Sequence, residues 1–183
     1  MAQSWRSRRS EPDARRARPL DAAGLERIAL RYVERYATTR AKLADYLNRK
    51  LRERGWAGES VAPVESLVET MAALGYVDDA AFANARAASL ARRGYGPRRV
   101  TMSLKAAGIA PEDAADAEAA ARQEAWTAAL AFSRRKKIGP FASVAADRAA
   151  REKAFAALLR AGHEVAIARR IVQSDPGDVP ELD

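Results

Sequence analysis

The chain has 183 residues, no cysteine and a net charge of +8 at pH 7. Without cysteine it has no disulfide, no thiolate chemistry and no cysteine-based metal site. No apolar run approaches the ~20 residues of a membrane-spanning helix, and the excess of basic residues favours acidic partners such as nucleic acid or an acidic protein face. We therefore expect a cytoplasmic protein without a membrane partner, a metal or a cofactor.

Both ends of the chain differ in composition from its middle. Residues 1–19 hold six arginines and two acidic residues, with little to bury apart from Trp5. Such a composition predicts a disordered Arg-rich tail. Residues 174–183 are rich in Pro and Asp and predict a flexible C-terminus. The folded domain is expected between them, over residues 20–173.

Within this domain, apolar residues recur at the spacing of one helical face, and no segment of useful length alternates with the period of a strand. The pattern predicts an all-α fold. The sixth predicted helix is long and alanine-rich and begins at Pro111. We expect the aromatic residues, Tyr32 and Tyr36 among them, to pack in the core. The predicted helices cover about residues 25–36, 43–51, 64–74, 79–93, 97–107, 111–135, 146–161 and 164–173.

The junction between the third and fourth helices carries complete stop and start signals. Gly75 can end a helix in the left-handed conformation. Asp78 can cap the next helix, and Asp79 adds negative charge where the helix dipole favours it. Val77 and Phe82 stand on either side of this cap, at the spacing of a hydrophobic staple. These residues predict a helix junction and not a strand turn.

The next junction, Gly94-Tyr95-Gly96-Pro97, repeats this logic. Gly94 can stop one helix, and Pro97 fits the first position of the following helix. Gly94-x-Gly96 is not a phosphate-binding loop, because it lacks the preceding strand and the lysine of that motif.

A leucine four residues before a glycine occurs three times, with Leu51, Leu104 and Leu158 spaced by 53 and 54 residues. A new helix is predicted after each of the glycines, which are Gly55, Gly108 and Gly162. Equal long intervals of this kind are typical of tandem repeats, which form elongated, curved arrays with one concave surface. We predict three tandem three-helix repeats, over about residues 20–75, 76–127 and 128–173.

The segment between Ala80 and Pro111 contains six cations and no acidic residue. Two arginines end one predicted helix and two begin the next, so four guanidinium groups are expected to converge around Tyr95. The helix dipole does not favour cations at a helix start, so phosphate or carboxylate contact is the natural reason for them. The alternative is an ordinary solvated face. Tyr95 itself could stack on a base, although packing over Gly96 and Pro97 is the favoured interpretation.

The candidate partner-binding or DNA-binding residues fall into two groups. The first surrounds the second junction and consists of Arg86, Arg92, Arg93, Tyr95, Arg98, Arg99 and Lys105. The second is a cationic run for which a solvated helix end is the alternative: Arg134, Arg135, Lys136 and Lys137.

Catalytic candidates are scarce. His163 is the only histidine, and because it follows Gly162 we expect it on the surface or at a helix cap. Glu112 and Asp113 belong to the first turn of a predicted helix, where the dipole accounts for them. We therefore expect no catalytic residue and no enzyme activity.

Three stretches form one ordered motif, reading GYVDDAAFA at 75–83, GYGPRRV at 94–100 and LKAAGI at 104–109. In order and spacing they resemble the central motif of the bacterial RecX recombination regulators. Weaker similarity extends over about residues 22–173. The chain departs from the family pattern at His163, where members commonly carry an aromatic residue, and around residues 128–141, which are poorly patterned.

The resemblance implies an all-α, three-repeat protein that binds the RecA recombinase and its filament on single-stranded DNA. Members of the family restrain filament extension and lower RecA's ATP hydrolysis, strand exchange and co-protease activity, with roles in recombination, repair and the SOS response. They act along the filament groove or at its growing end and are not enzymes. We expect a monomer with a cationic concave face, presented by a helix that Asp78 and Phe82 fix in place.

A second hypothesis remains open. A direct DNA binder would act on recombination by competing for DNA. It would bind tightly without RecA and lose affinity steeply with salt. A helical hydrolase is a third possibility, and it would require metal-dependent turnover.

Overall fold

The computed structural model describes residues 18–181, and over this range the chain forms nine α-helices and one 3-10 turn without a β-strand. A single bridge pairs Leu20 with Trp56. No helix of residues 18–181 has the length and apolar character needed to cross a bilayer. The elements in order are α1 Ala22–Arg35, α2 Arg40–Arg54, α3 Val64–Ala73, α4 Asp79–Arg92, α5 Pro97–Lys105, α6 Pro111–Gln123, α7 Ala125–Lys136, η1 Gly139–Phe141, α8 Arg148–Arg160 and α9 Val165–Gln173.

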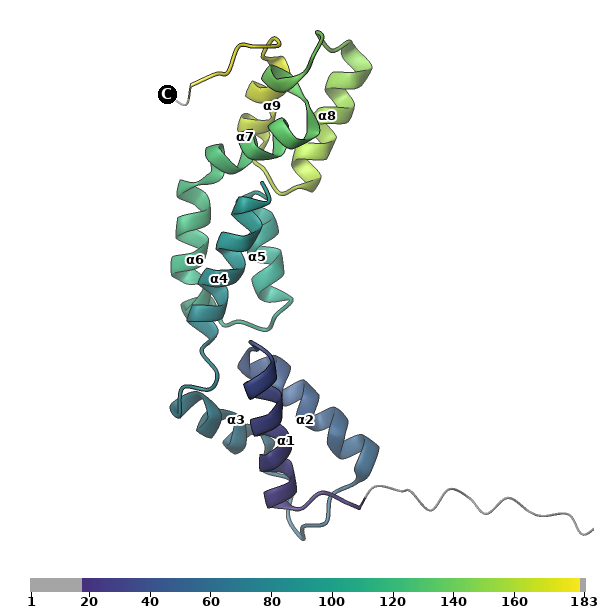
Figure 1. The fold of residues 1–183 in the computed structure, drawn as a ribbon, viewed down its shortest axis with the longest axis vertical. Helices are drawn as coiled ribbons and strands as arrows, with labels where there is room; N and C mark the ends of the chain where they lie inside the picture. The colour runs from purple at the N-terminus through teal and green to yellow at the C-terminus, as the bar shows by residue number, and fades with distance from the viewer. Residues whose placement is uncertain (1–17, 182–183) are drawn as a thin grey trace, which may run out of the picture.

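The helices form three groups stacked along the long axis of the molecule (Figure 1). The first repeat is α1–α3, the second α4–α6 and the third α7–α9. The stack is bent, and the second helix of each repeat (α2, α5 and α8) lies on the inner side of the bend, at the right of the view. The prediction of an all-α, elongated and curved array of tandem three-helix repeats is confirmed.

Each repeat encloses its own cluster of buried apolar side chains. The first is built around leucines such as Leu43 and Leu47, and the third around Phe132, Leu158 and Ile171. In the second, most of the buried residues of α4 and α6 are alanines, whose small side chains let the two helices approach closely. Because each core closes within one repeat, the relative placement of the repeats depends on contacts outside these cores.

The helix caps follow the sequence signals. The Asp78 carboxylate accepts the Ala81 N–H at 2.8 Å and caps α4. Gly75 (φ +78°) and Gly94 (φ +73°) are both left-handed, as predicted, and Pro97 begins α5. Val77 is buried in the first core, whereas Phe82 packs against the second, so the two residues of the expected staple belong to different repeats.

The prediction of one long helix over residues 111–135 is wrong. The helix breaks at Glu124 (φ −88°, ψ 9°), whose N–H still donates to the Ala120 carbonyl at 3.0 Å. The break redirects the chain into the third repeat, where Trp126 packs against the core. The buried alanines keep a spacing of four residues across the break, from Ala117 to Ala121 to Ala125, so hydrophobic periodicity does not reveal it.

Tyr36 also differs from the prediction. We expected it in the core with Tyr32, yet it is 50% exposed, whereas Tyr32 packs against the first core. The reason is that α1 ends at Arg35. Tyr36 follows in extended backbone (φ −132°, ψ 124°), so the helical period no longer directs its side chain inward.

The predicted Arg-rich tail, residues 1–19, lies outside the described residues except for Arg18 and Pro19. The Arg18 carbonyl accepts two hydrogen bonds from the Arg54 guanidinium, at 2.8 and 3.2 Å. Of the C-terminal segment 174–183, residues 174–181 are described, and there the Gly177 N–H donates to the Pro140 carbonyl at 2.9 Å.

Candidate partner interface

Tyr95 occupies the turn between α4 and α5 at the boundary of two repeats. Its N–H donates to the Leu90 carbonyl at 3.0 Å, which completes the end of α4. The ring is half-buried and packs against the cores of both the second and the third repeats. Packing against these two cores therefore holds Tyr95 in place, while part of it stays accessible. Its packing over Gly96 and Pro97 stays a prediction.

Three guanidinium groups surround the Tyr95 ring. The distances from the ring centroid are 5.3 Å to Arg93, 5.9 Å to Arg99 and 5.9 Å to Arg135. Each is within the range of a cation–π contact. The three arginines come from the end of α4, the first turn of α5 and the last turn of α7, so residues from two repeats meet at one ring.

Beside this ring lies a hollow of about 350 Å³ between α4 and α5, which we call the arginine hollow. The Arg86 Nε donates to the Ser103 Oγ at 2.8 Å across it. No acidic residue lines the hollow, so guanidinium donors there are available to an anion such as phosphate or carboxylate. Its lining residues are Arg86, Leu90, Arg93, Tyr95, Arg99, Met102, Ser103 and Ala106.

The expected convergence of four guanidinium groups on Tyr95 is correct for Arg93 and Arg99 but wrong for the other two. Arg92 lines a separate hollow between α4 and α6, because successive helical residues point about 100° apart. Arg98 is exposed, and its N–H donates to the Gly162 carbonyl at 3.2 Å. Lys105 is exposed in the last turn of α5.

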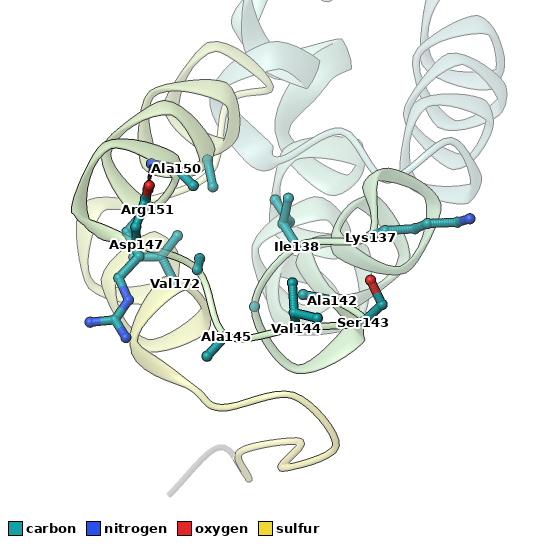
Figure 2. Close-up of a pocket in the computed structure, with 13 residues that line it drawn as sticks. Lys137, Ile138, Ala142, Ser143, Val144, Ala145, Asp147, Ala150, Arg151 and Val172 are labelled. Carbon is teal, nitrogen blue, oxygen red and sulfur yellow. Dashed lines mark hydrogen bonds between the residues drawn. The ribbon is translucent and has the colours of Figure 1, made fainter.

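The second predicted cluster divides in the same way. Arg135 lies over the Tyr95 ring beside the arginine hollow, although it does not line the hollow, and no signal in the sequence predicted this contact. The Arg134 guanidinium stacks over the Phe141 ring at 4.9 Å, and Lys136 is exposed. Lys137 (φ 54°) lines another pocket, of about 420 Å³, between the end of α7 and α8 (Figure 2).

Charge is distributed unevenly among the helices. The second helices are basic: α2 has six cations and two acidic residues, α5 has three cations and none, and α8 has four cations and one acidic residue. The third helices of the first two repeats are acidic, with two acidic residues and no cation in α3 and four against one cation in α6. The inner side of the bend therefore has an excess of positive charge.

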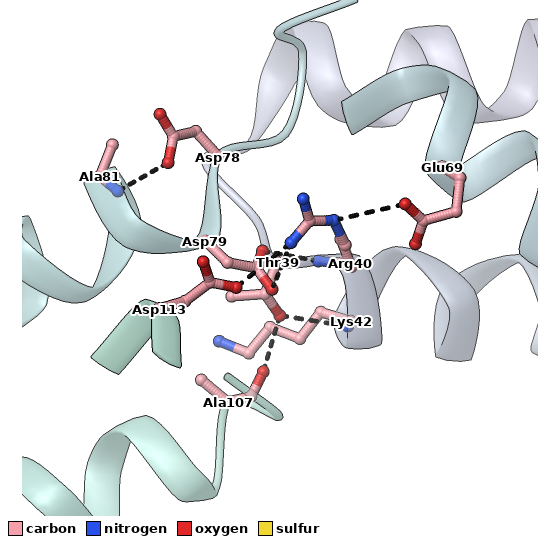
Figure 3. A network of polar contacts seen from close by, with 9 residues as sticks. All are labelled: Thr39, Arg40, Lys42, Glu69, Asp78, Asp79, Ala81, Ala107 and Asp113. Atoms are coloured by element: carbon pink, nitrogen blue, oxygen red, sulfur yellow. Dashed lines mark hydrogen bonds and ion pairs between the residues drawn. The ribbon is translucent and has the colours of Figure 1, made fainter. Parts of the chain in front are cut away.

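The first and second repeats meet through a polar network (Figure 3). The buried Asp79 carboxylate accepts the Arg40 N–H at 2.9 Å, at the first residue of α2. The Arg40 guanidinium lies 3.3 Å from the Asp113 carboxylate and 3.9 Å from those of Asp79 and Glu69. Burial raises the pKa of Asp79, and the hydrogen bond and charge of Arg40 oppose that rise. Asp79 was expected only to complement its own helix dipole, so its role between repeats is a finding of the structure.

The second and third repeats meet through backbone groups. The Gly96 N–H donates to the Ala161 carbonyl at 2.9 Å. A Cβ on Gly96 would clash with the Gly162 carbonyl oxygen, and one on Gly94 would lie 2.6 Å from the Phe132 nitrogen. The two glycines are therefore needed for close approach between repeats, in addition to the helix end predicted for Gly94.

His163 was expected on the surface or at a helix cap. The surface position is wrong, but the residue does belong to a helix end, because its N–H donates to the Leu158 carbonyl at 3.1 Å after α8. Its side chain is 0% exposed, and its Nε2 lies 3.0 Å from the Gly94 carbonyl oxygen. A carbonyl only accepts, so Nε2 carries the proton and donates. The ring meets the edge of Phe132, with centroids 5.7 Å apart. Burial lowers the pKa of His163, which keeps the imidazole neutral. In this chain, the His163 ring occupies the position at which the family that the sequence resembles commonly has an aromatic residue.

The repeat register contained a signal for these junctions. The interval of 54 residues that relates Leu104 to Leu158 also relates Ala107 to Ala161. The Ala107 carbonyl accepts from the Thr39 Oγ1 at 2.6 Å, and the Ala161 carbonyl accepts from Gly96. In both repeats, the turn after the second helix therefore contacts the start of the second helix of the preceding repeat.

Among the described residues, no group of three or more His, Cys, Asp or Glu side chains is placed to hold a metal ion.

Comparison with known proteins assigns this arrangement to a family. A family model described as RecX, second three-helix domain, matches residues 78–117. The regulatory protein RecX of Myxococcus xanthus (strain DK1622) is 33% identical over 177 residues, covering 92% of this chain and 95% of that protein. The chain belongs to the RecX family. The regulatory protein RecX of Agrobacterium fabrum (strain C58 / ATCC 33970) is 30% identical over 152 residues, covering 79% of each chain.

Solved structures agree on the fold. The crystal structure of RecX from Lactobacillus salivarius has a TM-score of 0.59 at 20% identity, covering 83% of this chain and 94% of that one. A second crystal structure, of a regulatory protein RecX, has a TM-score of 0.63 at 20% identity and covers 82% and 72%. The segment matched by the RecX family model includes α4 and α5, the two helices that form the arginine hollow.

Proposed function

We propose that this protein binds the RecA recombinase and its filament on single-stranded DNA and inhibits RecA ATPase, strand exchange and co-protease activity. It would do so by blocking or destabilising filament growth. Membership of the RecX family supports a regulatory role. The proposal places the protein in the cytoplasm as a monomer that acts by binding and not by catalysis, in recombination, repair and the SOS response.

The observation that carries the proposal is the arginine hollow. Arginines surround one half-buried tyrosine without an acidic residue in the lining, so no carboxylate of residues 18–181 neutralises this guanidinium cluster within the hollow. Such a cluster costs electrostatic free energy unless an anionic partner contacts it, and guanidinium groups bind carboxylate and phosphate in bidentate geometry. An acidic protein surface beside a DNA backbone offers both.

The excess of cations on the second helices supports a groove as the partner. A bent body with positive charge on its inner side can follow a curved, negatively charged surface, and the opposite charge accelerates the encounter. The acidic α3 and α6 would face away from the filament. In this arrangement the arginine hollow, at the middle of the body, is the central contact.

The test is ATP hydrolysis by RecA on single-stranded DNA, with this protein added to filaments that have already formed. We expect a slow decline at substoichiometric protein. The variant Arg93→Glu/Arg99→Glu reverses two charges in the hollow and should abolish the decline. The matched control, Arg92→Glu/Arg98→Glu, makes the same change in net charge in the same two helices but outside the hollow, and should retain most of the inhibition.

Circular dichroism of both variants checks that the helices are intact. Full inhibition by a folded Arg93→Glu/Arg99→Glu variant would remove the hollow from the mechanism. An equal loss in both variants would show that total charge matters and that the hollow does not.

The distribution of cations also favours a second candidate function, non-specific DNA binding that acts by competition for DNA. This candidate predicts steady ATP hydrolysis at excess protein while free DNA is bound. It also predicts a log–log salt slope of about −0.7 per phosphate contact on single strands and about −0.9 on duplex. Measuring both with the same preparation separates the two functions.

A further inference from the structure

Three tyrosine rings form a continuous row between α1 and α2 of the first repeat. The centroids of Tyr32 and Tyr46 are 4.1 Å apart with an interplanar angle of 15°, so these rings stack. Tyr36 continues the row at 5.3 Å from Tyr32, tilted by 50°. We call these three residues the tyrosine row. Its outer member, Tyr36, is 50% exposed.

Cations lie at both ends of the tyrosine row. The Arg35 guanidinium lies 5.6 Å from the centroid of the Tyr36 ring. At the other end, the Arg49 guanidinium and the Lys50 ammonium lie 5.4 and 5.8 Å from the centroid of Tyr46. A hollow of about 350 Å³ borders the row, and its remaining lining has three cations and one acidic residue: Lys42, Asp45, Arg49 and Arg52.

Core packing explains only part of this arrangement. Tyr32 and Tyr46 pack against the first core, which accounts for their position. It does not account for Tyr36, which lies beyond the end of α1 with half of its surface in solvent. An exposed aromatic ring at the end of a stack, with cations beside it, has the composition of a surface on which nucleobases stack and phosphates pair with basic side chains.

We propose that this face of the first repeat is a binding site for single-stranded nucleic acid. A base stacks on the exposed surface of Tyr36, and the backbone phosphates contact Arg35, Arg49 and Arg52. The ligand is single-stranded because the bases of a duplex already stack on one another and do not offer a free face. Binding is independent of sequence, since every base has a π-face.

This site is separate from the arginine hollow, which belongs to the second repeat. It does not depend on the proposed RecA-directed function, because the ligand is nucleic acid alone, and it would give the second candidate function, DNA binding, a defined site. A site of this kind would let the first repeat hold a strand while the rest of the array contacts another partner.

The experiment uses the full chain without RecA and a short oligo-dT that carries one 2-aminopurine. Fluorescence quenching reports stacking of the base, and anisotropy reports binding. Tyr36→Ala should weaken binding by at least about fivefold, the lower end for loss of one stacked base, and should reduce the quenching. Tyr36→Trp should keep or strengthen both signals. An abasic oligonucleotide with the same phosphates should bind wild type and Tyr36→Ala equally.

The charge contacts have a matched control. Arg49→Glu/Arg52→Glu reverses two cations of the hollow, whereas Arg27→Glu/Arg31→Glu reverses two exposed cations of α1 that do not line it. We expect a larger loss of affinity and a shallower salt dependence for the first variant. Equal losses in the two variants, or wild-type quenching by Tyr36→Ala, would overturn the site. Binding of a poly-glutamate peptide in place of the oligonucleotide, with the same dependence on Arg49 and Arg52, would assign the face to an acidic protein segment and overturn it as well.

Discussion

The two junctions between repeats place equivalent parts of the chain together but join them by different chemistry. At both junctions, the start of the second helix of one repeat meets the turn after the second helix of the next. These pairs are α2 with the turn after α5, and α5 with the turn after α8. Between the first and second repeats, the Thr39 hydroxyl and the Arg40–Asp79 pair make the contact. Between the second and third, it is made by the Gly96 N–H and the buried ring of His163.

This difference shows how a repeat array can vary its joints while keeping its geometry. The first junction is joined mainly by polar side chains, although a glycine is packed closely there as well, because a Cβ on Gly108 would clash with the Ala41 side chain. A glycine junction brings the backbones together, because Gly94 and Gly96 have no Cβ to separate them. The glycine junction also lets Arg135 of the third repeat reach the Tyr95 ring of the second repeat. The contact of Arg135 with Tyr95 therefore depends on the glycine junction, whereas the arginine hollow itself is lined by residues of the second repeat alone.

The largest effect is expected from Gly94→Ala, with Gly75→Ala as its matched control. Both residues end a helix in the left-handed conformation (φ +73° and +78°), where alanine costs about 1–2 kcal/mol. Gly75 has no atom within 4 Å of an added Cβ, whereas at Gly94 that atom would lie 2.6 Å from the Phe132 nitrogen. Gly94→Ala should therefore lower the free energy of unfolding by a further ~1–3 kcal/mol.

Urea denaturation followed by circular dichroism measures both glycine variants. Equal losses for Gly75→Ala and Gly94→Ala would mean that the junction relaxes around the added methyl group. Close approach of the repeats would then not be what the glycine provides.

A smaller effect is expected at the polar junction from Asp79→Ala. The change leaves the Arg40 N–H without its acceptor and Arg40 without one of its carboxylates, which should cost about 1–3 kcal/mol in unfolding free energy. Arg40 keeps Asp113 and is partly exposed to solvent, which limits the loss. Asp79→Asn keeps an acceptor and should recover part of the stability. The neighbouring change Asp78→Ala removes an exposed cap and should cost about 1 kcal/mol; a larger loss for Asp78→Ala than for Asp79→Ala would contradict the assignment.

The smallest and most selective effect is the pH dependence of the glycine junction. Burial lowers the pKa of His163 from 6.5, so below that pH the unfolded chain binds a proton that the folded protein does not. Stability should therefore fall as the pH is lowered through 6.5. Protonation would also place a charged ring in a buried site where Nδ1 has no hydrogen-bond partner.

His163→Phe provides the control for this prediction, because it keeps an aromatic ring and removes the titration. Unfolding free energies at pH 7.5 and pH 5.5 should differ less in this variant than in wild type. The raised pKa of Asp79 has the opposite sign, since its folded form holds a proton more tightly, so the polar junction does not share this loss. Identical pH dependence in the two proteins would exclude His163 as its source.

The sequence by itself determined the local structure of this protein. Helical periodicity, the Asp78 cap and the left-handed glycines depend on neighbours within a few residues, so they are readable without tertiary contacts. The interval between Leu104 and Leu158 gave the tandem repeat for the same reason, since each repeat closes its own core. The resemblance in residues 75–109 gave the family, which the comparisons confirmed.

Only the tertiary structure decided how the repeats meet and which cations gather. Asp79 reaches Arg40, Gly94 receives His163, and Arg135 replaces Arg92 and Arg98 beside Tyr95. These contacts join residues tens of positions apart, and they follow from the break at Glu124 and from glycines that let neighbouring repeats approach closely. A pattern within one helix contains no information about the helix that will lie against it. The composition of the second helices therefore predicted a basic protein, but only tertiary packing formed the arginine hollow between α4 and α5 and brought Arg135 of the third repeat to its tyrosine.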